Sequence, residues 1–310
     1  MGLKTQRFFK MEIAWVFPGQ GSQKVGMAKE VIDLKDAKQK FNYASEIFER
    51  DLYRICEENS SSVIPNNDLS NTKNTQICLF LVESILVDSL KEKGYKPNYL
   101  AGHSLGEITA LYAAEVLSFD SCVSLIKVRS ELMSNAPDGS MAALIGFNRD
   151  ELNVQVNQIN DLVIANDNSS SQVVLSGKKE ALENISTKIK CKRFIHLNVS
   201  GAFHSHLMSD PANKFSEYLD TLIFQKPIFP IISNSNPTLS QDSVELKLRL
   251  KQQMCNGVRW RETMDLMSSK APNNLHLIEV GPSNVLGGLA KRHLKNAQIS
   301  QVSSSNNLSY

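Results

Sequence analysis

The pattern G-x-S-x-G at residues 102–106 contains the strongest candidate nucleophile of the chain, Ser104. It follows a short apolar run, residues 99–101, and precedes a helical pattern, so Ser104 is expected on a sharp strand-to-helix turn. Such a turn needs small residues on both sides of the serine and aims backbone N–H groups of the helix at a bound oxyanion. The pattern predicts acyl chemistry at Ser104. The alternative is a plain turn in which glycine only permits close packing.

An activated serine needs a base, and the candidates are the six histidines of the chain: His103, His196, His204, His206, His276 and His293. The side chain of His103 is expected to point away from its neighbour Ser104. His204 and His206 rank first, because they lie where the chain returns from a predicted small subdomain, and spacing ranks the two only loosely ahead of the rest. No acid stands out as the orienting partner, so we expect a backbone or amide carbonyl in that place.

A glycine-rich loop, residues 18–23 (PGQGSQ), follows the first strand-like run at residues 13–17. A Walker A loop is excluded, because Met27 and Ala28 stand where lysine and serine or threonine are required. The dinucleotide pattern G-x-G-x-x-G also fails, since Lys24 replaces its third glycine. What remains is a tight loop at the carboxyl end of a predicted parallel strand, where such sheets bind ligands. Gln20 would present its amide or backbone N–H there, and the alternative is a turn with a solvated glutamine.

Arg129 lies in a predicted helix, residues 121–133, among apolar neighbours such as Leu125 and Ile126. In such surroundings an arginine usually covers the core with its stem and keeps its charge in water. The functional alternative is a bidentate clamp for a substrate carboxylate. The spacing leaves both interpretations open.

The composition indicates a globular protein without a strong charge bias. Of 310 residues 42% are hydrophobic, and 34 Lys and Arg against 32 Asp and Glu give a net charge of +2. This balance argues against nucleic-acid binding, and no apolar run reaches the roughly 18 residues of a membrane helix. Residues 1–10 lack the apolar stretch of a signal peptide. Five scattered cysteines without a CxxC pair argue against zinc, so we expect a cytoplasmic protein with free thiols and no metal.

Strands and helices alternate along most of the chain, which predicts a parallel sheet covered by helices. Strands are expected at 13–17, 99–101, 275–280 and 297–302, a loop at 59–74, and helices from about 22 to 58 and at 75–93, 105–116, 121–133 and 285–293. Residues 141–199 instead carry the order βαββαβ, which is the ferredoxin-like pattern. We predict a discontinuous large α/β subdomain (11–137 and 201–303), a small inserted subdomain (138–200) and flexible tails (1–10 and 304–310).

Several motifs in register resemble the malonyl-CoA:acyl-carrier-protein transacylase family of fatty acid synthesis, whose relatives include acyltransferase modules of polyketide synthases. The matching segments are residues 17–23 (FPGQGSQ), 102–107 (GHSLGE), Arg129, 172–174 (QVV) with Gly177, 201–205 (GAFHS) and 279–282 (EVGP). Their order and spacing hold from about residue 13 to 295. The resemblance implies a hydrolase-like α/β subdomain with a ferredoxin-like insertion, in agreement with the pattern above.

The resemblance also implies roles for the matching residues. It makes Ser104 the acylated nucleophile and His204 its base. The backbone amides of Gln20 and Leu105 correspond to the oxyanion hole of the family. Arg129 corresponds to the arginine that binds the malonyl carboxylate.

The resemblance implies three further residues of the site. Gln253 corresponds to the residue whose main-chain carbonyl orients the histidine, although Gly257 stands where the family frequently has proline. Asn166 falls in the loop that faces the active site in relatives. His103 is a further candidate for the lining of the cleft.

The implied reaction transfers malonyl from malonyl-CoA to the phosphopantetheine thiol of holo-acyl carrier protein through a malonyl-serine ester, with ping-pong kinetics. The enzyme needs no cofactor of its own, since the partner carries the phosphopantetheine, and the family is typically monomeric. Because carrier protein is acidic in this pathway, the cluster Lys188, Lys190, Lys192 and Arg193, expected on the small subdomain beside the cleft, is a candidate docking surface. A solvated charge run is the alternative.

Three other functions compete with this one. A serine esterase or thioesterase shares the serine turn but does not need Arg129, and water would then remove the acyl group. A polyketide-type acyltransferase is chemically close, and residues 201–204 (GAFH) resemble its malonyl-selecting motif. A chain of 310 residues without flanking synthase domains favours a discrete enzyme. A non-catalytic carrier-protein binder is disfavoured by the intact Ser104 and His204.

Overall fold

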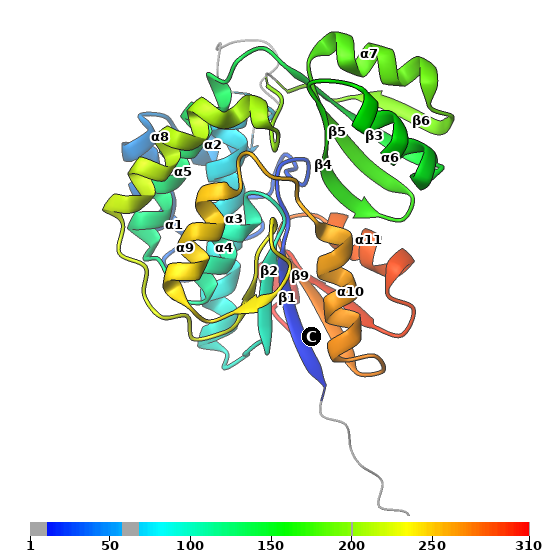
Figure 1. The fold of residues 1–310 in the computed structure, drawn as a ribbon. Helices are drawn as coiled ribbons and strands as arrows, with labels where there is room; N and C mark the ends of the chain where they lie inside the picture. The colour runs from blue at the N-terminus through cyan, green and yellow to red at the C-terminus, as the bar shows by residue number, and fades with distance from the viewer. Residues whose placement is uncertain (1–10, 58–67, 200, 310) are drawn as a thin grey trace, which may run out of the picture.

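Two sheets form the framework of the molecule, which is a computed structural model that describes residues 11–57, 68–199 and 201–309 (Figure 1). The larger sheet has six strands in the order β10-β9-β1-β2-β7-β8, and only the last pairing, β7 with β8, is antiparallel. Its strands are β1 (Glu12–Phe17), β2 (Tyr99–Gly102), β7 (Ile231–Ile232), β8 (Leu239–Ser240), β9 (Leu275–Val280) and β10 (Gln298–Val302).

Helices cover both faces of this sheet, because its central strands are apolar on both sides. Along β1, Trp15 and Phe17 enter one core, whereas Ala14 and Val16 enter a second. The first core is built with α1 (Ala37–Phe48), α2 (Leu52–Glu57), α3 (Thr72–Glu92), α4 (Gly106–Ala113), α5 (Phe119–Ser134), α8 (Ser209–Thr221) and α9 (Ser243–Gln252). The second core is built with α10 (Trp260–Lys270) and α11 (Val285–His293), on the opposite side of the sheet in Figure 1.

The smaller sheet is antiparallel, with the order β4-β5-β3-β6. It consists of β3 (Ser140–Phe147), β4 (Leu162–Ser169), β5 (Gln172–Gly177) and β6 (Cys191–His196), and the helices α6 (Arg149–Gln158) and α7 (Lys179–Lys188) complete a βαββαβ unit. Apolar side chains such as Leu144, Leu152 and Leu182 form a separate core between this sheet and its helices. The predicted fold class, a parallel α/β sheet with a ferredoxin-like insertion, is confirmed.

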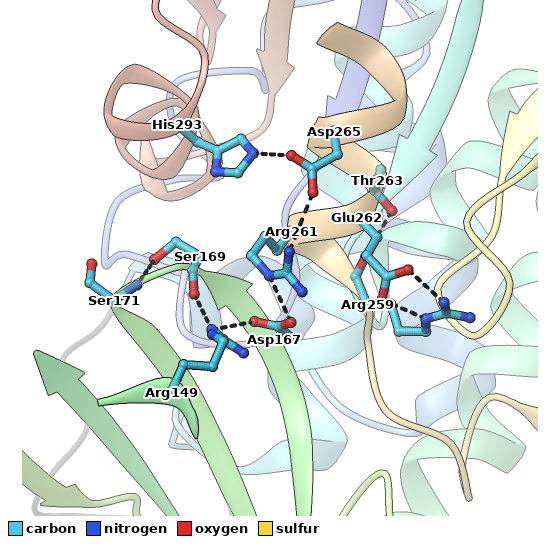
Figure 2. A network of polar contacts seen from close by, with 10 residues as sticks. All are labelled: Arg149, Asp167, Ser169, Ser171, Arg259, Arg261, Glu262, Thr263, Asp265 and His293. Atoms are coloured by element: carbon cyan, nitrogen blue, oxygen red, sulfur yellow. Dashed lines mark hydrogen bonds and ion pairs between the residues drawn. The ribbon is translucent and has the colours of Figure 1, made fainter. Parts of the chain in front are cut away.

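Strand β4 joins the smaller sheet to the larger subdomain. The backbone N–H of Val258 donates to Ala165 O at 2.7 Å, and that of Asp167 donates to Val258 O at 2.9 Å. The Asp167 carboxylate also lies between two guanidinium groups, Arg149 of α6 at 2.9 Å and Arg261 of α10 at 3.0 Å (Figure 2). Main-chain and charged contacts therefore fix β4 against the segment that leads into α10.

Two segments differ from their predicted conformation. The helix expected from about residue 22 to 58 is confined to α1 and α2, because Asp36 and Glu49, which flank α1, adopt left-handed φ angles of 58° and 54° that interrupt a helix. The tail expected to be flexible at 304–310 contains a short 3-10 helix, η2 (Ser305–Asn307), and Leu308 is buried in the first core. Helix α3 begins at Thr72, within the expected loop 59–74. The expected flexible tail 1–10 and most of that loop lie outside the described residues.

The structure also shows the state of the cysteines and the character of the helices. All five cysteines lie in the described part of the chain and are free, and Cys56, Cys78 and Cys122 are buried. Within residues 11–57, 68–199 and 201–309, no helix combines the length and the apolar content needed to cross a bilayer.

Candidate active site

Ser104 lies on a strained turn between β2 and α4. Its φ is 52°, in the left-handed region that residues with a side chain rarely adopt. The two glycines of the motif make the turn possible. A Cβ built on Gly102 would lie 1.9 Å from the Gly106 carbonyl group, and one on Gly106 would lie 2.1 Å from Phe17 O. The predicted turn is therefore present, and its glycines are required by close backbone contact.

His204 is the histidine that the fold brings to Ser104, with Nε2 at 2.8 Å from Ser104 Oγ. Its Nδ1 lies 2.9 Å from Gln253 O and 3.2 Å from Asn256 O. Because carbonyl oxygens only accept hydrogen bonds, Nδ1 must carry the proton and Nε2 must present its lone pair to the serine hydroxyl. Two backbone carbonyls thus fix the ring in the tautomer of a general base.

Arg129 of α5 reaches the same hydroxyl from another direction. Its guanidinium is buried, and Nη2 donates to Ser104 Oγ at 3.1 Å and to Gln253 Oε1 at 2.9 Å. Nη1 donates to Gln76 Oε1 at 2.7 Å. The buried Nε has no acceptor within the described residues. The interpretation in which the charge of Arg129 lies in water does not hold, because its guanidinium is directed into the molecule.

The loop that contains Gln20 packs directly against the serine turn. A Cβ built on Gly19 would lie 2.4 Å from His103 O and 3.6 Å from Leu105 N. The side chain of Gln20 donates to Thr72 Oγ1 at 3.3 Å. Gln20 and Leu105 both line a small cavity of about 80 Å³ that also contains Ser104 and His204. The two candidate oxyanion-hole residues are therefore neighbours at the serine.

Asn166 and His103 line this cavity as well. The buried Oδ1 of Asn166 has no hydrogen-bond donor among the residues that the structure describes. His103 donates from Nε2 to Asn168 Oδ1 at 2.9 Å and packs edge-on against Trp260, with ring centroids 5.5 Å apart. Its ring is tied to these two partners, so it is not available as the base of Ser104.

Burial and charge set the protonation states of the site. Burial, reinforced by the positive charge of Arg129, lowers the pKa of His204 to about 3. Burial lowers the pKa of Arg129 to about 10, opposed by the nearby Glu107 carboxyl. His204 is therefore neutral and Arg129 charged at pH 7, so a neutral imidazole and a guanidinium cation lie beside Ser104 at the same time.

The remaining histidines have partners elsewhere. His206 lies 3.0 Å from Asp161, His276 lies 2.8 Å from Ser300 Oγ, and His293 lies 2.7 Å from Asp265 (Figure 2 shows the last pair). His196 is exposed at the edge of the small sheet. Across the described part of the chain, no cluster of His, Cys, Asp and Glu side chains has the arrangement of a metal site.

Four polar residues of the site were missed by the sequence analysis. Gln76 binds Arg129, and Asn168 binds His103. Glu107 accepts a hydrogen bond from Gln253 Nε2 at 2.7 Å, and Asn234 accepts one from Ser104 N at 2.6 Å. All four side chains are buried in the structure. In the sequence, the available signal is a polar residue within an apolar run, because such residues are usually exposed unless they have a partner, and it is clearest for Gln76 within α3.

Comparison with known proteins identifies the family. The acyl transferase domain model matches residues 14–306. A malonyl CoA-acyl carrier protein transacylase of Synechocystis is 43% identical over 282 residues, which cover 91% of this chain and 94% of that protein. The solved structure of the Synechocystis malonyl-CoA:ACP transacylase superposes with a TM-score of 0.91 at 41% identity, covering 96% of this chain and 99% of that one. A malonyl-transacylase in complex with its holo type II polyketide-synthase acyl-carrier protein gives a TM-score of 0.87 at 31% identity, covering 96% and 97%. This chain belongs to the malonyl-CoA:acyl-carrier-protein transacylase family.

Proposed function

We propose that this protein transfers the malonyl group from malonyl-CoA to the phosphopantetheine thiol of acyl carrier protein and so supplies fatty acid synthesis. The observation that carries the proposal is the convergence of His204 Nε2 and Arg129 Nη2 on Ser104 Oγ, at 2.8 and 3.1 Å. A neutral base activates the hydroxyl, and a buried cation beside it selects an acyl group that bears a negative charge. The full-length similarity to malonyl-CoA transacylases supports the same substrate.

In the first half-reaction, Ser104 Oγ attacks the thioester carbonyl of malonyl-CoA while His204 Nε2 takes the hydroxyl proton. The backbone N–H groups of Gln20 and Leu105 stabilise the negative charge on the carbonyl oxygen, and loss of one such donor typically costs about 10²–10³ in rate. The C–S bond then breaks, His204 returns its proton to the leaving thiolate, and free coenzyme A departs. A malonyl-serine ester remains.

Arg129 has the donors that a malonyl carboxylate requires. Its orphan Nε is buried, and a buried donor without an acceptor is unfavourable, so a substrate carboxylate would supply the missing partner. Two parallel N–H···O bonds from a guanidinium fix a carboxylate in one plane, which a lysine ammonium does not do. Asn166 lines the same cavity, and its buried Oδ1 has no donor among the described residues, so we propose that an N–H group of the bound substrate donates to it.

In the second half-reaction, the carrier-protein thiol occupies the position that coenzyme A left. His204 Nε2 takes the thiol proton, the sulfur attacks the ester carbonyl, and the Ser104 oxygen leaves and regains a proton from His204. Serine, histidine and arginine supply the nucleophile, base and cation, so the proposed reaction needs no resident cofactor. We place it in the cytoplasm, which the five free cysteines support, since cytosolic thiols are kept reduced.

Intact-mass measurement of the purified protein with malonyl-CoA tests the proposal. The wild type should gain one malonyl group and lose it on addition of holo-carrier protein, and Ser104→Ala should gain none. An adduct that water removes as fast as carrier protein does would indicate a hydrolase instead. Absence of any adduct, with malonyl-CoA unchanged, would reject Ser104 as the acylated nucleophile.

A further inference from the structure

Asn234 lies two residues after the end of β7, and all four of its polar groups are hydrogen-bonded. Its backbone N–H donates to Glu107 Oε2 at 3.3 Å, and its backbone carbonyl accepts from Arg259 N at 3.0 Å. Its side-chain Oδ1 accepts from Ser104 N at 2.6 Å, and its Nδ2 donates to Gly102 O at 2.5 Å. The residue is only 2% exposed. Its main chain is fixed on both sides, and its amide holds two backbone groups of the serine turn.

These two backbone groups flank the strained part of the turn. Ser104 has a φ of 52°, and a conformation of this kind persists only where the surroundings hold it. Strand β7 pairs with β2 only as far as Ala101, so the sheet ladder does not reach Ser104. The Asn234 amide continues the hydrogen bonding of β7 to β2 beyond that point, with a donor for Gly102 O and an acceptor for Ser104 N.

We propose that Asn234 is a positioning residue for acyl transfer: its amide holds Gly102 and Ser104 in the conformation that points the Ser104 hydroxyl at His204. The inference rests on the proposed function, because it takes Ser104 as the acylated residue. A consequence follows for the oxyanion hole. Since Asn234 occupies the Ser104 N–H, the carbonyl oxygen of the substrate must be bound by other amides, as proposed for Gln20 and Leu105.

The proposed positioning role requires a donor for Gly102 O and an acceptor for Ser104 N, so substitutions of Asn234 can be distinguished by which of these two groups they keep. Asn234→Ala removes both groups. Asn234→Asp keeps the acceptor, but its carboxylate places an oxygen against the Gly102 carbonyl, and only the protonated acid restores the donor. Asn236→Ala is the matched control, because Asn236 lies in the same segment with an exposed side chain whose hydrogen bond goes to Thr238 Oγ1.

The first test measures how fast Ser104 reacts. Single-turnover acylation by malonyl-CoA and labelling by a fluorophosphonate are followed by rapid-quench mass spectrometry, with thermal unfolding recorded for each variant. Misplacement of a reacting group by about 1 Å can cost on the order of 10²-fold, so Asn234→Ala should slow both reactions about 10- to 100-fold. The malonyl-CoA concentration at half-saturation should stay within about twofold, because the hydrogen bonds that Arg129 donates to Gln76 and Gln253 do not involve Asn234. Asn236→Ala should match the wild type.

The second test varies the pH with Asn234→Asp, in which the side chain keeps nearly the same shape as asparagine. The labelling rate of Asn234→Asp, divided by the wild-type rate, should rise as the pH falls from 8 to 5, because protonation returns the donor to Gly102 O. The titratable and charged groups around this position are Glu107, which binds the Asn234 N–H, and His103 between the two held residues. His204 and Arg129 lie at Ser104, and Arg259 binds the Asn234 carbonyl through its backbone N–H and Ser235 O through its guanidinium at 3.3 Å. The wild type contains them all, so the ratio isolates the introduced carboxyl.

Two results would overturn the inference. One is an Asn234→Ala enzyme that unfolds like the wild type and reacts at the wild-type rate. The other is a pH-independent rate ratio for Asn234→Asp, which decides the matter if the alanine variant does not fold. A wild-type protein that reacts with the fluorophosphonate but not with malonyl-CoA would instead contradict the proposed function, and the fluorophosphonate rates would still report on Asn234.

Discussion

At the scale of single residues, the histidine at Ser104 is oriented by backbone carbonyls instead of a carboxylate. Gln253 O and Asn256 O hold His204 Nδ1–H without adding negative charge. The pKa of His204 consequently has no acid to raise it, while burial and the charge of Arg129 lower it to about 3. The imidazole of His204 is therefore neutral over a wide pH range, as the proposed role of a general base requires.

This protonation state predicts a flat pH profile. Ser104 labelling by an uncharged fluorophosphonate should stay constant from pH 8 to about 5, whereas an ordinary histidine would lose activity below about 6.5. Arg129→Ala removes one cause of the lowered pKa, so the acid limb of that variant should move toward higher pH. A wild-type limb near pH 6.5 would show that His204 is not held in this state. The measurement is the labelling rate at fixed reagent concentration across the range.

Arg129 contacts both Ser104 and the space for the acyl group, and substitution separates the two effects. A hydrogen bond to a charged group contributes about 1.5–3 kcal/mol, so Arg129→Lys should reduce kcat/KM for malonyl-CoA about 10- to 100-fold. Arg129→Ala should cost more, because a buried carboxylate then has no cation. With acetyl-CoA, which has no carboxylate, both variants should fall much less. If kcat/KM fell equally with malonyl-CoA and with acetyl-CoA, Arg129 would act only through its hydrogen bond to the Ser104 hydroxyl.

At the scale of elements, the sequence predicts those features that depend on residues close together in the chain. The turn at Ser104 depends on glycines two positions away, and the βαββαβ order was legible from local periodicity. His204 and His206 were only loosely ranked, because φ at His204 is 58° and spacing does not encode that rotation. Asn234 could not be found at all: its position depends on β7 lying beside β2, which only the assembled sheet determines.

The contribution of the contact between β4 and α10 to stability can be tested through its central carboxylate, Asp167. Asp167 is 15% exposed and binds Arg149 and Arg261 at once, so Asp167→Asn should lower the free energy of unfolding by about 1–3 kcal/mol. Asp265 is the matched control, because it also binds Arg261 but is 52% exposed (Figure 2). Asp265→Asn should change stability by less than about 1 kcal/mol. Urea unfolding of both variants checks the prediction, and equal effects would contradict it.

At the scale of the whole molecule, the cavity lies where the two subdomains meet. The serine, the arginine and the Gln20 loop come from the large subdomain, whereas Asn166 comes from β4 of the small one. Leu197 and Val199, which follow β6, also line the cavity. A carrier protein that delivers its phosphopantetheine to Ser104 must therefore dock at this junction, within reach of both subdomains.

The basic residues Lys188, Lys190, Lys192 and Arg193 stay the predicted docking surface. All four side chains are exposed, at the end of α7 and along β6. Arg193 lies in β6, four residues before Leu197, which directly follows this strand and lines the cavity. Attraction between exposed charges is screened over about 8–10 Å at physiological salt. Transfer to an acidic carrier protein should therefore weaken steeply as salt rises, mainly through a higher KM for the carrier protein.

Charge reversal at this surface should abolish that salt dependence. The double variant Lys190→Glu/Lys192→Glu should raise the KM for carrier protein about tenfold at low salt, as loss of about 1.4 kcal/mol of attraction implies, and leave Ser104 acylation by malonyl-CoA unchanged. Lys38→Glu/Lys226→Glu is the matched control, because both lysines are exposed on the large subdomain, in α1 and in the loop before β7. The acylation rate and the carrier-protein KM are measured from 50 to 500 mM salt. If both double variants keep the wild-type salt slope, the four basic residues form only a solvated charge run, and carrier protein approaches the junction from another side.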